Sequence, residues 1–134
     1  MATMSLSTTT RTAEAQAIIT AAGATGAKLK LYNGTQPANA AAALSGNTLL
    51  ATLSWTSVPI GTATAGAVDF DEASVSQTSS GHVAGTPTFV DITTSGDVVV
   101  ARVPIGAGGF TFTGAVAPGQ NVTLATMAIT AGNA

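Results

Sequence analysis

The strongest constraint on the fold is a change in the spacing of apolar residues near Gly26. Before this glycine, apolar residues recur at the intervals that form one face of an α-helix. After it, apolar and polar residues alternate in short runs, which is typical of strands with one buried face. Turn-forming residues interrupt these runs. The chain therefore predicts one N-terminal helix followed by a series of short strands.

The helix is predicted over residues 11–22, an alanine-rich run without glycine or proline. Thr10 is the predicted N-cap, and Gly23 is a suitable terminator. Residues 1–10 form a predicted N-terminal arm that has no charged side chain and no features of a secretory signal. The apolar face of the helix comprises Ala15, Ile18, Ile19 and Ala22.

Strands are predicted over residues 28–32, 49–55, 66–70, 73–77, 86–93, 97–103, 110–113 and 121–130. The pair Ser95-Gly96 predicts a hairpin between the fifth and sixth of these runs. Residues 35–47 form a connection so long that we expect it to pack against the fold or to bind something. In the second run, the residues expected to share the buried face are Leu49, Ala51, Leu53 and Trp55.

The last predicted strand changes phase along its length. Val122 and Leu124 define one face, whereas Met127 and Ile129 define the other. This slip predicts a β-bulge or a strand shared between two sheets.

Short strands in this number, after one short helix, predict a mainly β fold. The expected architecture is an antiparallel β-sandwich, jelly-roll-like, in a single domain over residues 11–134. Threonine suits outward strand faces and keeps them polar without charge. Because charged residues that protect strand edges are scarce, we expect neighbouring subunits to cover these edges.

Charge excludes several classes of function. Charged residues make up 7% of the 134 residues, with 4 Lys and Arg, 6 Asp and Glu, and a net charge of -2. Such a chain does not neutralise a run of phosphates, so no nucleic-acid partner is expected. The chain has no cysteine, which excludes disulfides and thiolate sites. No apolar run is long enough to span a membrane as a helix.

Catalytic and metal-binding patterns are also missing from the sequence. His82 is the single histidine, and we interpret it as a surface or loop residue, not as part of a triad with Asp91 or Asp97. Asp69, Asp71 and Glu72 form an acidic cluster that we interpret as a solvated turn or strand edge, with an ion at this cluster left open. We therefore expect no enzyme, no cofactor and no metal site.

Two aromatic residues have polar groups that suit a partner surface. Tyr32 and Trp55 are the only aromatic side chains of this kind in the chain. Core packing is the default interpretation of Trp55, which shares a face with leucines. An anchor at a protein interface is the alternative.

Three blocks of the sequence are distinctive: Leu31-Tyr32-Asn33-Gly34-Thr35-Gln36-Pro37, Gly85-Thr86-Pro87-Thr88-Phe89 and the terminal Ile129-Thr130-Ala131-Gly132-Asn133. Together they resemble a family of small, mostly uncharacterised proteins encoded by tailed bacteriophages and prophages. The resemblance covers nearly the whole chain and implies a structural component of the virion. It carries no catalytic residue over.

From this resemblance we expect a capsid decoration, or cement, protein that is made in the host cytoplasm and placed on the capsid surface. Its partners would be the major capsid protein and other copies of itself, as a dimer or trimer. The alternatives are a module of the tail, neck or fibre, and a carbohydrate-binding or adhesin-like sandwich. Candidate partner contacts are Met1, Thr3, Met4, Leu6, Tyr32 and Trp55.

Overall fold

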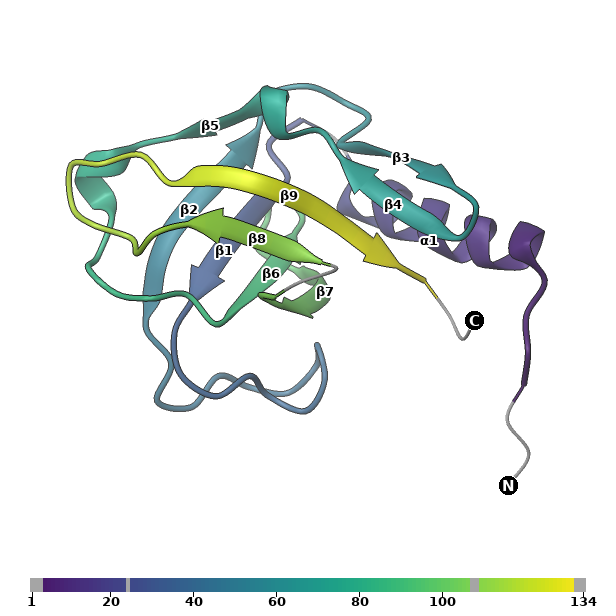
Figure 1. Cartoon of the computed structure of the whole chain (residues 1–134), viewed down its shortest axis with the longest axis horizontal. Coiled ribbons are helices and arrows are strands. Elements are labelled where there is room, and N and C mark those ends of the chain that lie inside the picture. The colour runs from purple at the N-terminus through teal and green to yellow at the C-terminus, as the bar shows by residue number, and fades with distance from the viewer. Residues whose placement is uncertain (1–3, 24, 107–108, 132–134) are drawn as a thin grey trace.

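The computed structural model describes residues 4–23, 25–106 and 109–131. In this part of the chain, one α-helix precedes two antiparallel sheets that pack face to face (Figure 1). The predicted mainly β, sandwich-type fold with one N-terminal helix is therefore confirmed, whereas its jelly-roll character remains a prediction. The elements are α1 (Thr8–Ala22), β1 (Lys28–Tyr32), β2 (Leu49–Trp55), β3 (Gly61–Thr64), β4 (Ala67–Phe70), the 3₁₀-helix η1 (Glu72–Ser74), β5 (Val75–Gln77), the 3₁₀-helix η2 (Ser79–Gly81), β6 (Phe89–Thr93), β7 (Val99–Pro104), β8 (Phe110–Thr113) and β9 (Thr123–Thr130).

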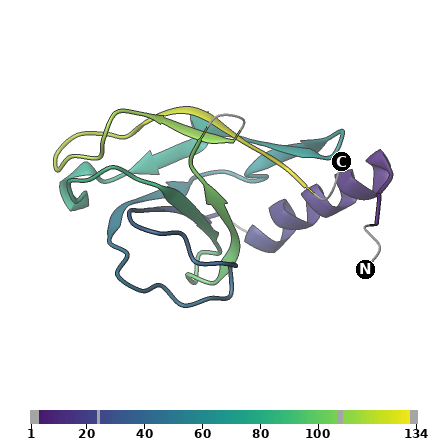
Figure 2. The ribbon, with the colours of Figure 1, turned by 60° about the horizontal axis from the view of Figure 1, so that its bottom comes forward.

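The two sheets share no strand. The five-stranded sheet has the order β5-β2-β1-β6-β7, and the four-stranded sheet has the order β3-β4-β9-β8. Helix α1 lies at one end of the sandwich, beside β3 and β4 (Figure 2). The predicted hairpin at Ser95-Gly96 is confirmed, because β6 pairs with β7 in antiparallel register.

The helix begins earlier than the sequence predicts. Its N-cap is Ser7, whose hydroxyl accepts a hydrogen bond from the Thr10 backbone N–H at 3.2 Å, so the assignment of the cap to Thr10 is wrong. Thr10 and its two preceding threonines belong to the first turn, which shortens the arm before the helix. The predicted apolar face and the terminator Gly23 are confirmed, since Gly23 adopts a φ of 78° after the last turn.

A bulge in β2 changes which side chains it buries. Tyr32 pairs with Leu49, and Leu31 pairs with Ala51, so Leu50 is the extra residue. Leu50 is buried, whereas Leu49 is 38% exposed. The prediction that Leu49 shares the buried face is therefore wrong, although the rest of that face is correct.

The phase slip in β9 is a bulge within one sheet. Thr111 of β8 pairs with Thr126, and the next residue pairs with Leu124, which leaves Ala125 without a partner. Strand β9 lies between β4 and β8 in the four-stranded sheet. The bulge is thus confirmed, and the alternative of a strand shared between two sheets is wrong.

The sequence does not predict strand β3 or the two 3₁₀-helices, η1 and η2. Strand β3 joins β4 through Ala65 and Gly66, which have φ angles of 52° and 82° and form a tight two-residue turn. Its sequence is Gly-Thr-Ala-Thr, which has too little apolar character for an alternating pattern to be recognised. Residues 73–77 were predicted as one strand, but the first of them belong to η1 and only Val75–Gln77 form β5.

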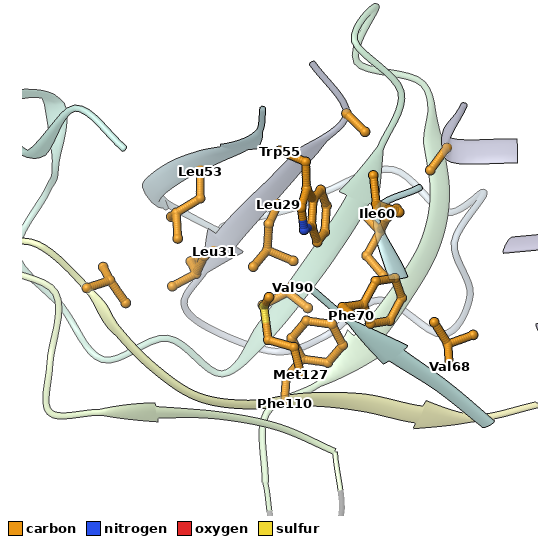
Figure 3. Close-up of a cluster of buried hydrophobic side chains, with 14 of the residues drawn as sticks. Leu29, Leu31, Leu53, Trp55, Ile60, Val68, Phe70, Val90, Phe110 and Met127 are labelled. Atoms are coloured by element: carbon orange, nitrogen blue, oxygen red, sulfur yellow. The ribbon is translucent and has the colours of Figure 1, made fainter. Parts of the chain in front are cut away.

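The core lies between the two sheets and continues under α1. Three aromatic rings form its centre: Trp55 lies 5.7 Å from Phe70, and Phe70 lies 5.5 Å from Phe110. Figure 3 shows these rings surrounded by aliphatic side chains from both sheets. The labelled neighbours are Leu29, Leu31, Leu53, Ile60, Val68, Val90 and Met127.

Candidate functional site

The candidate contact residues lie in two different environments. Met1 and Thr3 are outside the described residues. Met4 is 69% exposed, and Leu6 is half-buried, both in the segment that leads away from α1 (Figure 1). These two side chains remain available for a partner.

Tyr32 and Trp55 are not available to a partner on the outer surface of this chain. Trp55 is 1% exposed, and its Nε1–H donates to the Asp71 carbonyl at 3.1 Å, which confirms its default interpretation as a core residue. Tyr32 is 8% exposed and stacks on Phe89 at 5.4 Å between ring centroids. Their interpretation as exposed interface anchors is therefore wrong.

Charged side chains gather on the outer face of the five-stranded sheet. Lys30 of β1, Asp91 of β6 and Arg102 of β7 are cross-strand neighbours in one row. Lys28 and Asp97 lie beside this row and form an ion pair. Of the 4 basic side chains, all but Arg11 are on this face. The sequence did not indicate this clustering, because the residues come from three separate segments.

The centre of the row is a buried ion pair. Arg102 binds Asp91 through two hydrogen bonds, from Nε at 2.6 Å and from Nη2 at 2.8 Å. Their side chains are 3% and 2% exposed. The pair raises the pKa of Arg102, chiefly through the hydrogen bonds to Asp91. The guanidinium and the carboxylate thus satisfy each other's hydrogen-bonding groups inside the fold.

The same arginine fixes the long connection between β1 and β2. Its Nη1 donates to the carbonyls of Asn39 and Ala42 at 2.9 and 3.0 Å. Asn47 closes the base of this connection by donating to the carbonyls of Asn33 and Thr35. The expectation that residues 35–47 pack against the fold is therefore confirmed.

A second, more exposed set of charges borders the row. The ammonium groups of Lys28 and Lys30 both lie within 2.9 Å of Asp97 Oδ1. These hydrogen bonds, first from Lys28 and then from Lys30, lower the pKa of Asp97 to about 2. Asp97 adopts a φ of 68° in the β6–β7 turn, so the turn aims its carboxylate at β1.

The acidic cluster has structural roles in part. Asp71 caps η1 by accepting hydrogen bonds from the Ala73 N–H and the Ser74 hydroxyl. Glu72 accepts from the Met127 N–H at 3.1 Å. Asp69 is exposed on β4. The placement of Asp71 and Glu72 at η1 agrees with the interpretation as a turn, whereas Asp69 lies on an interior strand and not at a strand edge. Among residues 4–23, 25–106 and 109–131 no three metal-ligating side chains converge.

His82 lies in a loop, but it is not on the surface. It is 4% exposed, and its Nδ1 lies 2.9 Å from the Gln120 carbonyl. Nε2 is buried and has no hydrogen-bond partner among the described residues. The surface interpretation is therefore wrong. Asp91 and Asp97 are engaged by Arg102 and by lysines, so the imagined triad does not form.

The outer face of the four-stranded sheet is lined by threonines. The opposite residues Thr111 and Thr126 share a hydrogen bond between their hydroxyls at 2.7 Å. Asp69 is the charged residue on this face. The threonines are Thr62, Thr64, Thr111, Thr113, Thr123, Thr126 and Thr130. The predicted use of threonine on outward strand faces is thus correct.

Comparisons with known proteins gave no relative. No family model, no curated protein and no solved structure matches the chain. Within the described part of the chain, no helix is long and apolar enough to cross a membrane.

Proposed function

We propose that the protein is a structural component of a tailed-bacteriophage virion, a capsid decoration protein that binds and stabilises the lattice of the major capsid protein. The observation that carries the proposal is the threonine-lined outer face of the four-stranded sheet. This face is broad, polar and nearly free of charge, so a partner covers it without removing charges from water. It acts by physical contact, and many copies on a symmetric lattice strengthen weak contacts.

The placement of the aromatic rings favours assembly over sugar binding. Sugar-binding sandwiches usually display aromatic rings on an accessible face. In this protein, all the phenylalanine, tyrosine and tryptophan side chains belong to described residues, and none of them is fully exposed. The threonine face itself carries no ring. The carbohydrate-binding alternative therefore has no platform for a sugar.

Binding to purified capsids tests the proposal. The protein should bind empty, expanded capsids, raise their melting temperature and remain bound when the salt concentration is raised, because few charges take part. Thr62→Lys places a charge on the threonine face and should weaken binding. Ser80→Lys adds the same charge on η2, an exposed position outside this face, and should leave binding unchanged.

Three results would reject the proposal. The first is an absence of binding to capsids while the protein binds tails, necks or fibres. The second is an equal loss of binding in both lysine variants, which would mean that the threonine face has no special role. The third is a clear set of hits on a glycan array, which would revive the sugar-binding alternative.

A further inference from the structure

An apolar groove runs along the open side of the sandwich, between β7 and β9. Its volume is about 510 Å³. The apolar side chains along it are half-buried, unlike the fully buried core beneath them. It is lined by Ala101, Val103, Ile105, Ala128 and Ile129 among other residues. One charged residue, Arg102, borders it, and its side chain is turned to the outer face of the sheet.

Strand β7 is the free edge beside this groove. The Ile105 N–H bonds to the Thr88 carbonyl, so the backbone groups of Ile105, and by alternation those of Val103, face β6. Arg102 and Pro104 therefore turn their backbone groups to the open edge. Because proline has no N–H, the backbone of β7 can form only a short series of hydrogen bonds at this edge, centred on Arg102. The edge is therefore poorly suited to pairing with another full-length strand.

The segment before α1 has the complementary properties. Residues 4–7 form no regular structure and lead away from the body of the chain (Figure 1). The first ten residues have no charged side chain, and Ser7 has the extended angles φ -64° and ψ 155°. In an extended segment, Met4 and Leu6 point to the same side, because side chains alternate. Met4 exposes 69% of its surface, which is costly for a large apolar side chain with no partner.

We infer that residues 4–7 of one copy dock into the β7–β9 groove of a second copy. Met4 and Leu6 enter the apolar groove, and the backbone of the arm pairs with β7 at Arg102. The arm is short, which suits an edge that Pro104 limits to a short ladder. Two copies that exchange arms close into a dimer, whereas arms that are passed on to further copies close into a ring or continue as a chain.

This inference deepens the proposed assembly role, but it concerns contact between copies and not contact with the capsid. The protein alone, without capsids, tests it. If the copies do not join while capsid binding persists, the inference fails and the proposed function stands.

Disulfide trapping gives a direct test, since the chain has no cysteine of its own. One variant carries Leu6→Cys, and a second, of different mass through a tag, carries Ala101→Cys. Under mild oxidation, the mixture should form a cross-linked product that contains one chain of each. Ser80→Cys replaces Ala101→Cys in the control mixture, because η2 lies outside the groove. If Ala101→Cys does not fold, Val103→Cys probes the same groove.

Outcomes of the trapping experiment decide the inference. A mixed product several times more abundant than in the control supports it. No mixed product, or an equal yield with Ser80→Cys, overturns it. A chain that carries both Leu6→Cys and Ala101→Cys and cross-links only within itself also overturns it, because the arm then docks on its own chain.

A charge scan of the arm tests its seating. Leu6→Asp should abolish self-association measured by analytical ultracentrifugation, because it places a carboxylate in the groove. Ser5→Asp adds the same charge on the opposite side of an extended segment and should have a much smaller effect. An equal loss in both variants would contradict the proposed seating.

Discussion

Replacing Arg102 by methionine should destabilise the fold more than replacing any other basic residue. The substitution keeps much of the apolar stem and removes the guanidinium. Asp91, whose side chain is 2% exposed, then remains as a buried carboxylate without its partner. The carbonyls of Asn39 and Ala42 lose their shared donor as well.

The size of the effect follows from the burial of both charges. Removing one partner of a buried ion pair costs about 3–5 kcal/mol. Domains of this size have a free energy of unfolding of about 5–15 kcal/mol, so the Arg102→Met variant should be marginally stable. At roughly 3–4 °C per kcal/mol, Tm should fall by about 10–20 °C. Lys28→Met should cost far less, because Lys30 continues to neutralise the exposed carboxylate of Asp97.

A double-mutant cycle with urea unfolding measures the coupling. Asp91→Leu alone should also destabilise strongly, because it leaves Arg102 unpaired. The double variant should recover most of the loss and lie within about 1–2 kcal/mol of the parent, since no buried charge remains. Amides of residues 39–44 should exchange faster with solvent in both Arg102 variants, because the connection has lost its anchor.

Two results would refute the reasoning. One is a loss below about 1 kcal/mol for Arg102→Met, which is the range of a solvent-exposed pair. The other is simple additivity of the two single changes in the double variant, which would show that the charges do not act on each other.

Three further predictions concern other parts of the fold. Asp97 should titrate with a pKa of about 2 by NMR, and replacement of either lysine by methionine should raise this pKa towards 3.8. Because folding lowers the pKa, the ionised carboxylate stabilises the fold above about pH 3.8, and this stabilisation is lost as the pH falls through about 2. Titration near 3.8 in the parent would contradict the geometry. Ser7→Ala should lower the free energy of unfolding by about 1 kcal/mol in urea titrations, and Thr10→Ala should lower it by less. A larger effect of Thr10→Ala would show that Thr10 is the helix N-cap. Trp55→Phe should lower the free energy of unfolding by about 1–3 kcal/mol in thermal unfolding, because the partly buried Asp71 carbonyl loses its donor. An unchanged Tm would show that this hydrogen bond is not important.

Local patterns identified the elements whose burial contrast is strong. The alternation around Leu29 and Leu31 located β1 at its correct bounds, and the phase change beyond Leu124 located a bulge. The same reasoning missed β3, because glycine, threonine and alanine give little contrast between two faces. It also placed the helix cap three residues late, since Ser7 and the threonines after it are all good capping residues.

The candidate site was less predictable than the fold. The sequence identified the uncharged N-terminal arm, in which the structure describes Met4 and Leu6. It also identified threonine as the residue of outward strand faces. It gave no sign that Asp91 meets Arg102, because the pairing depends on the register between β6 and β7. Nor did it indicate the groove, which is formed by two strands far apart in the chain.

The sequence by itself determined the periods of the helix and strands, the scarcity of charge and the polarity of the outward faces. These properties depend on residues that are neighbours along the chain. Only the tertiary structure decided that Tyr32 and His82 are buried and that most of the basic side chains share one face. The physical reason is that alternation of apolar and polar residues distinguishes the two faces of a strand, but it does not show what covers each face. Burial of the outer face of the five-stranded sheet depends on residues 35–47, which Arg102 holds in place.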